Sequence, residues 1–199
     1  MVYRIPAVNL VGRGCLAQLK DEIGTLGCKK ALVVSDKFLT ENGVVEKVTK
    51  VLDQVGIEHT LYNDVKQNPS VANVEGGLEV LKKENCDFIV SIGGGSPQDC
   101  GKAISVLATN GGKITDYEGV NKSQKKCLPI VAIATTAGTS AEVTINYVIT
   151  DEETHIKMIM VDRNTLASIT VNDPELMLSK PAGLTAATGM DALTHAIEG

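Results

Sequence analysis

Three consecutive glycines occupy positions 93–95 and are followed by Ser96 and Pro97. Glycine lets the backbone come close to a ligand, and proline suits the first turn of a helix. The free N–H groups and the dipole at such a helix N-terminus attract phosphate. The spacing matches neither a Walker A loop nor Gly-x-Gly-x-x-Gly. These residues therefore predict a site for a pyrophosphate, and the alternative is a tight corner without a ligand.

Two further polar segments follow apolar ones. Asp36 comes after residues 31–35, and Thr-Thr-Ala-Gly-Thr-Ser fills positions 135–140. Beside a dinucleotide, the Asp36 carboxylate would accept hydrogen bonds from a ribose 2′-hydroxyl and repel a 2′-phosphate, which favours NAD over NADP. Its alternative role is that of a turn residue. The hydroxyl-rich segment offers donors to the same ligand, or else it is an ordinary polar loop.

Asp191 and His195 stand four residues apart near the end of the sequence. On a helix this spacing puts both side chains on one face. A carboxylate oxygen and an imidazole nitrogen so placed can hold a divalent metal ion. The alternative is an ordinary Asp–His contact on a helix surface.

The elements that must position these residues alternate between strands and helices. Short apolar segments predict strands at 31–35, 57–62, 88–92 and 128–134, and spacings of three and four predict helices within 15–26, 44–55, 71–81 and 103–107. This order indicates an α/β fold with an open, mostly parallel sheet. We expect a hairpin of residues 146–150 and 156–161 appended to that sheet, and a last helix at 185–198. Ligands of such sheets bind at the carboxyl ends of the strands, where the three polar segments should converge.

The composition excludes several classes of function. The 199 residues carry 19 Lys and Arg against 24 Asp and Glu, and only 3% are aromatic. The sequence therefore has neither the basic footprint nor the aromatic platform of a nucleic-acid-binding protein. It also shows no polybasic membrane patch, no apolar stretch of membrane-spanning length and no signal peptide, so we expect a cytoplasmic protein. The five cysteines lack Cys-x-x-Cys spacing, which indicates buried side chains rather than disulfides or a zinc site.

Several motifs together resemble the iron-dependent (group III) alcohol dehydrogenase family. They are residues 93–99 with Lys102, Thr-Thr-Ala-Gly-Thr-Ser-Ala-Glu at 135–142, Asp-Pro-Glu-Leu at 173–176, and the segment 184–198 that contains Asp191 and His195. The resemblance implies a Rossmann-like domain at 1–180 that binds NAD, followed at 181–199 by the first helix of an all-α metal-binding domain. It also implies reversible hydride transfer between nicotinamide and a small primary alcohol or diol, of the lactaldehyde and 1,2-propanediol type, at Fe²⁺ or else Zn²⁺.

The resemblance also assigns site residues. The residues expected to bind NAD are Asp36, Asn68, Gly94, Gly95, Ser96, Asp99, Thr135, Thr136, Thr139, Asn146 and Lys157. Asp36 would bind the adenosine ribose, residues 94–96 the pyrophosphate with Asp99 supporting their loop, and the threonines, Asn146 and Lys157 would line the path to the nicotinamide. Asp191 and His195 would be two of the metal ligands.

No residue of the sequence is assigned a catalytic role. The family's two remaining metal ligands and a histidine associated with catalysis lie in a region that follows this segment. We therefore expect no turnover by the 199-residue chain alone. The intact protein is expected to be a homodimeric enzyme. The alternatives are a noncatalytic dinucleotide-binding module, a 1,3-propanediol or other short-chain alcohol dehydrogenase, and a relative of glycerol dehydrogenase or dehydroquinate synthase.

Overall fold

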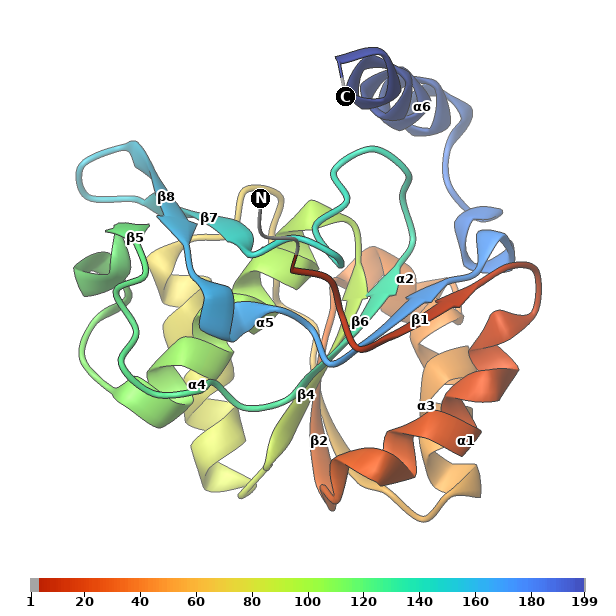
Figure 1. The fold of residues 1–199 in the computed structure, drawn as a ribbon, viewed down its shortest axis with the longest axis horizontal. Helices are drawn as coiled ribbons and strands as arrows, with labels where there is room; N and C mark the ends of the chain where they lie inside the picture. Colours follow the sequence, from red (N-terminus) through yellow and green to blue (C-terminus); the bar gives the residue numbers. More distant parts are fainter. Residues whose placement is uncertain (1–3, 199) are drawn as a thin grey trace.

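The computed structural model describes residues 4–198, which build a six-stranded parallel sheet between two layers of helices (Figure 1). The strands are β1 (Val8–Val11), β2 (Lys30–Val34), β3 (Glu58–Tyr62), β4 (Phe88–Gly93), β6 (Ile130–Ala134) and β9 (Ile169–Asn172). They lie in the order β1-β9-β6-β4-β2-β3, and every neighbouring pair is parallel. The open, mostly parallel α/β sheet predicted from the sequence is thereby confirmed.

Alternate residues of each central strand enter opposite cores, which explains why the strands are apolar throughout. In β2, Leu32 and Val34 belong to one core and Ala31 and Val33 to the other. The first core packs beneath α4 (Val71–Lys83) and α5 (Gly95–Asn110), and the second beneath α1 (Leu19–Glu22) and α3 (Val44–Gln54). The two helical layers lie on opposite sides of the sheet in Figure 1.

Three elements of this domain were not predicted as such. β9 lies inside the sheet, between β1 and β6, so the strand at Ile130–Ala134 is not the last of the sheet. Polar Thr170 and Asn172 alternate with its apolar residues and conceal it in the sequence. The short helix α2 (Lys37–Glu41) follows β2, and the expected helix at 15–26 is a series of η1 (Cys15–Gln18), α1 and η2 (Ile23–Leu26).

The expected hairpin is present, but it is not on the edge of the main sheet. β7 (Asn146–Asp151) and β8 (Ile156–Val161) pair antiparallel and, with β5 (Gly119–Val120), form a second sheet in the order β5-β8-β7. The side chains of Tyr147 and Ile149 in β7 belong to the core beneath α5. The hairpin therefore packs as a flap over α5 instead of pairing with a strand of the first sheet. Short helices η3 (Ile114–Tyr117), η4 (Arg163–Thr165) and η5 (Pro174–Met177) complete the connections.

The last helix, α6 (Ala182–Glu198), stands apart from both layers (Figure 1). None of its residues is buried, and Met190, Leu193 and Ile197 are half exposed or more. The expected helix at 185–198 is confirmed and begins three residues earlier, just after Pro181. Within residues 4–198 no helix is long and apolar enough to cross a bilayer.

Candidate functional site

The candidate site lies where neighbouring strands β2 and β4 send the chain to opposite faces of the sheet. β2 leads into α2 and α3 on one face, whereas β4 leads into α5 on the other. Such a reversal opens a crevice outside the carboxyl ends of the two strands. Here the crevice is a cleft of about 540 Å³.

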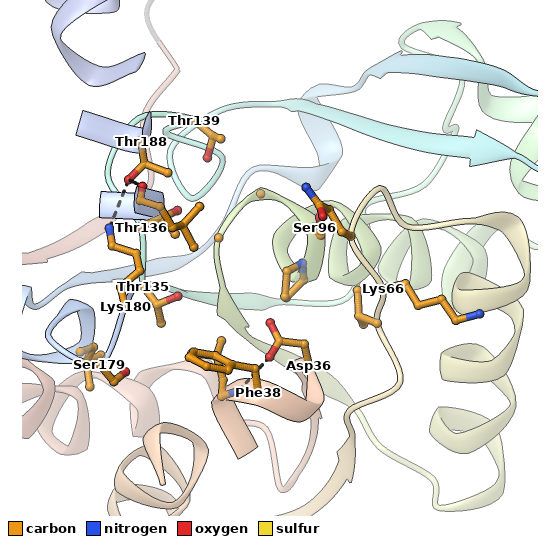
Figure 2. A pocket seen from close by; sticks show the side chains of 18 of the residues that line it. Asp36, Phe38, Lys66, Ser96, Thr135, Thr136, Thr139, Ser179, Lys180 and Thr188 are labelled. Atoms are coloured by element: carbon orange, nitrogen blue, oxygen red, sulfur yellow. Dashed lines mark hydrogen bonds between the residues drawn. The ribbon is translucent and has the colours of Figure 1, made fainter. Parts of the chain in front are cut away.

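Eight of the eleven residues expected to bind the cofactor line this cleft. They are Asp36, Asn68, Gly94, Gly95, Ser96, Thr135, Thr136 and Thr139. The segments that carry them follow β2, β3, β4 and β6, as the parallel sheet requires. Figure 2 shows Asp36, Ser96 and the three threonines around the same space. The structure therefore brings together segments that are up to about a hundred residues apart in the chain.

The glycine loop (residues 93–95) fits tightly against the threonine loop (residues 135–140). A Cβ atom on Gly94 would lie 2.8 Å from the Thr136 Oγ1 atom, and one on Gly95 would lie 3.4 Å from Thr139 Cγ2. A side chain on Gly93 would collide with the Pro97 ring at 2.4 Å. Helix α5 begins at Gly95, and no side chain caps its first N–H groups. Since residues 94–97 line the cleft, these N–H groups and the positive dipole end of the helix face it.

Asp36 caps helix α2 and also lines the cleft. Its Oδ1 atom accepts a hydrogen bond of 2.8 Å from the Leu39 N–H and thereby caps α2. The residue is only partly buried and lines the cleft, where Figure 2 shows its carboxylate beside Phe38. The cap uses one oxygen, so the other remains available to a ligand in the cleft.

Asn68 links the glycine loop to the second sheet. Its backbone N–H donates to the Ser96 hydroxyl at 3.3 Å, and its side-chain oxygen accepts from the Lys157 ammonium at 2.9 Å. Its φ angle of +55° lies in the left-handed region, which asparagine tolerates better than most residues. Lys157 thus reaches the rim of the cleft through Asn68, although it does not line the cleft itself.

Asp99 and Asn146 do not line the cleft, and the roles expected of them, support of the glycine loop and a place on the path to the nicotinamide, stay predictions. Asp99 stands one turn into α5 and accepts a hydrogen bond from the Val148 N–H at 3.1 Å. It therefore ties α5 to the hairpin. Asn146 is exposed, and its carbonyl oxygen faces the ammonium of Lys102.

Lys102 is a buried cation surrounded by carbonyl oxygens. Its Nζ atom donates to the carbonyls of Ala141, Thr144 and Asn146 at 2.6, 2.9 and 2.7 Å. Burial lowers the pKa of Lys102 to about 8, while nearby Asp99 and Glu142 act in the opposite direction. Lys102 of α5 therefore holds in place, by hydrogen bonds to three carbonyls, the segment between the threonine loop and β7.

Burial of Asp99 gives the protein an expected pH dependence. Burial raises the pKa of Asp99 to about 6, although Lys102 and the Val148 N–H oppose the shift. The ordinary pKa in the unfolded chain is lower, so between about pH 4 and 6 the folded state holds more protons and stability falls as the pH rises. The expected loss is on the order of 2–3 kcal/mol, measured by urea unfolding across this range.

The Asp99→Asn variant should lack this component of the pH dependence, because the amide oxygen can still accept from Val148. Asp64→Asn, at an exposed position, is the matched control and should keep the slope of the parent. An identical slope in the parent and in Asp99→Asn would show that Asp99 does not titrate as described.

Asp191 and His195 of α6 lie against Gly138 of the threonine loop. The His195 Nδ1 atom lies 2.9 Å from the carbonyl oxygen of Gly138, and its Nε2 atom lies 3.9 Å from Asp191 Oδ1. If Nδ1 carries the proton and donates to that carbonyl, the lone pair of Nε2 faces the carboxylate. A Cβ atom on Gly138 would lie 2.6 Å from Asp191 Oδ2, so only glycine lets the loop approach α6 this closely.

Asp191 and His195 lie close enough together to be two ligands of one metal ion. The separation of their donor atoms and their partial exposure allow both to reach one ion after a small rotation. Residues 4–198 contain no group of three or more His, Cys, Asp or Glu side chains placed to hold a metal ion. By themselves the two ligands should bind a divalent ion weakly.

One wall of the cleft was not predicted from the sequence. It comes from the segment after β9 and from α6, and comprises Leu176, Ser179, Lys180, Leu184 and Thr188. Because β9 was not recognised, the residues at its carboxyl end were not considered for the site. The signal that could have found them is Ile169-Thr170-Val171 followed closely by Pro174.

A model of the family described as iron-containing alcohol dehydrogenase matches residues 6–174. The chain belongs to the iron-containing alcohol dehydrogenases. The match covers every strand of the main sheet and the four segments after β2, β3, β4 and β6 that line the cleft. The family resemblance drawn from the motifs is thereby confirmed.

Among curated relatives, alcohol dehydrogenase 4 of Schizosaccharomyces pombe is 54% identical over 98% of this chain and 46% of its own length. Lactaldehyde reductase of Escherichia coli is 46% identical over 94% of this chain and 50% of its own length. The chain therefore spans about half the length of these relatives. One of these relatives is thus named as an alcohol dehydrogenase and the other as an aldehyde reductase.

Solved structures of the family agree with the fold. The crystal structure of 1,3-propanediol oxidoreductase has a TM-score of 0.95 and 46% identity, and the match covers 98% of this chain and 51% of that one. Sulfoacetaldehyde reductase from Bifidobacterium kashiwanohense, solved in complex with NAD⁺, has a TM-score of 0.89 and 35% identity over 99% of this chain and 52% of that one.

Proposed function

We propose that residues 1–180 form the NAD-binding domain of an iron-containing alcohol dehydrogenase and that residues 181–199 begin its helical metal-binding domain. The intact protein would transfer hydride reversibly between nicotinamide and a small primary alcohol or diol. The observation that carries the proposal is the cleft, where the uncapped N-terminus of α5, the glycine loop and Asp36 meet at one sheet edge. This combination suits a dinucleotide with a pyrophosphate and a free ribose 2′-hydroxyl.

The chain's own residues would hold and orient the cofactor. The N–H groups of residues 94–96 at the start of α5 would bind the pyrophosphate. The three threonines of the cleft and Asn146 would line the path toward the nicotinamide. Asp36 would accept from the adenosine ribose, and Asn68 and Lys157, already bonded to each other, would border the path toward the nicotinamide. Asp99 is not assigned to the cofactor, because its carboxylate is bonded to the hairpin.

Asp191 and His195 are the residues proposed to hold the metal, which we take to be Fe²⁺, with Zn²⁺ as the alternative. A divalent ion held there would supply Lewis-acid chemistry at the alcohol oxygen, lowering its pKa. Gly138 orients the His195 ring through its carbonyl, which is the usual way a protein fixes a ligating histidine. The position of both residues on α6, above the threonine loop, would bring that oxygen toward the cofactor cleft.

The substrate is proposed as a small alcohol or diol of the lactaldehyde and 1,2-propanediol type. Lactaldehyde reductase and 1,3-propanediol dehydrogenase of Klebsiella pneumoniae have the same identity of 46% to this chain, so identity alone does not choose between them. The homodimer and the cytoplasmic location expected of the intact protein stay predictions.

Titration calorimetry of the 199-residue chain tests the proposal. We expect NAD to bind, and we expect no NADH formation from 1,2-propanediol in the presence of Fe²⁺ or Zn²⁺, because within residues 4–198 no third His, Cys, Asp or Glu side chain joins Asp191 and His195 to hold an ion. Absence of NAD binding would refute the assignment of the cleft. Turnover by this chain alone would refute the claim that it is catalytically incomplete, and NAD binding with no metal uptake at all would favour a noncatalytic binding module.

The role of Asp36 can be tested by separating its charge from its cap. Asp36→Asn keeps an oxygen for the Leu39 N–H but removes the charge that disfavours a 2′-phosphate. We expect the ratio of the NADP and NAD dissociation constants to fall by about tenfold, with stability within about 0.5 kcal/mol of the parent. Asp36→Ala is the comparison, and should lose a further 1 kcal/mol or so of stability with the cap. An unchanged cofactor ratio in Asp36→Asn would contradict the assignment.

A further inference from the structure

Lys180 is a charged residue of the cleft that the proposed function does not use. Three charged side chains line the cleft, namely Asp36, Lys66 and Lys180. Figure 2 shows the Lys66 ammonium pointing away from the cleft, whereas the Lys180 side chain extends along its wall toward Thr188. Lys180 is therefore the cation that a ligand in the cleft would meet.

The surroundings of Lys180 leave its charge uncompensated. The residue is partly buried, and its Nζ atom donates to the Thr188 Oγ1 atom at 3.2 Å. That partner is a neutral hydroxyl, and no carboxylate within residues 4–198 forms an ion pair with Lys180. Desolvation lowers the pKa of Lys180, as expected for an ammonium that has lost water without gaining a counter-ion.

Contacts between loops place Lys180 on the wall of the cleft opposite the glycine loop. Thr188, its partner, belongs to the stretch of α6 that packs on Gly138 of the threonine loop. Thr136 of the same loop contacts Gly94, and Figure 2 shows Thr136 and Thr188 next to each other above Lys180. The ammonium and the N-terminus of α5 thus border one space from two walls.

We propose that Lys180 binds the pyrophosphate of the nucleotide in this cleft, opposite the N–H groups at the start of α5. The inference rests on the proposed function, since it takes that nucleotide to be NAD. The helix dipole of α5 offsets the two phosphate charges only in part, and the Lys180 ammonium would add a full positive charge on the opposite side. Because Lys180 lies just before α6, the contact would also join the bound cofactor to the helix that carries Asp191 and His195.

The test compares ligands with and without phosphate on the 199-residue chain. Titration calorimetry measures NAD and ADP, and ligand-observed NMR measures adenosine. Lys180→Met should weaken NAD and ADP by about tenfold and leave adenosine unchanged, and Lys180→Arg should restore most of the affinity. Lys83→Met is the matched control, because it removes the same charge from an exposed side chain of α4 that does not line the cleft.

Two results would overturn the inference while the proposed function stands. One is unchanged ADP affinity in Lys180→Met, and the other is an equal loss of adenosine, which would mean that Lys180 shapes the pocket without contacting phosphate. Failure of the parent chain to bind either NAD or ADP would overturn the proposed function and the inference with it. Thermal unfolding of each variant confirms that the comparison is between folded proteins.

Discussion

The Lys102→Met variant is expected to lose about 3 kcal/mol of its free energy of unfolding, the largest effect of any substitution considered on stability. The substitution keeps an unbranched side chain that is one atom shorter, but it removes the donor shared by the carbonyls of Ala141, Thr144 and Asn146. These oxygens would remain turned toward an apolar side chain, and a buried acceptor without a donor is costly. Urea unfolding measures the loss.

Lys83→Met on the exposed surface of α4 is the control, and its stability should stay within about 0.5 kcal/mol of the parent. A loss below about 1 kcal/mol in Lys102→Met would mean that water replaces the ammonium without much cost. Because the carbonyls belong to the segment after the threonine loop, we also expect NAD to bind less tightly to this variant.

The Gly94→Val variant is expected to bind NAD at least about a hundredfold more weakly, which corresponds to about 2.7 kcal/mol. The new Cβ atom would lie 2.8 Å from the Thr136 Oγ1 atom and push that side chain into the cleft. The valine methyl groups would in addition cover the N–H groups at the start of α5. Titration calorimetry with NAD measures the effect, and thermal unfolding reports whether the fold is kept.

Gly24→Val is the matched control for this prediction. A Cβ atom at Gly24 would meet no atom within 4 Å, and the residue is exposed far from the cleft. We expect its NAD affinity to equal that of the parent. Equal affinities in Gly94→Val and the parent would show that the nucleotide does not approach the glycine loop.

The sequence was most informative where the physical cause is local or periodic. The apolar strands at 31–35 and 88–92 could be predicted because both faces of the sheet are covered, and parallel strands must then bring Asp36, the glycines and the threonines to one edge. β9 escaped prediction because polar Thr170 and Asn172 interrupt its apolar residues. The cleft wall with Lys180 was therefore missed as well.

Side-chain orientation was the second limit. The family resemblance assigned Asp99 to the support of the glycine loop, and it gave no sign of the hydrogen bond that Asp99 accepts from Val148 of the hairpin. Lys102 was noted as part of a motif, while its cage of carbonyls depends on a segment some forty residues later in the chain. Contacts of this range arise from how α5 and the hairpin pack, and no local pattern encodes them.

Helix α6 contributes no buried residue to either core and contacts the domain through Gly138 and Lys180. Its folding is consequently a separate local equilibrium, which opens and closes without the cooperative unfolding of the sheet. Amide hydrogens of α6 should then exchange with solvent on the timescale of an isolated helix, while those of β4 and β6 exchange only through global unfolding. In this 199-residue chain, the two residues proposed as metal ligands would thus be attached to the stable sheet by a helix that folds largely by itself.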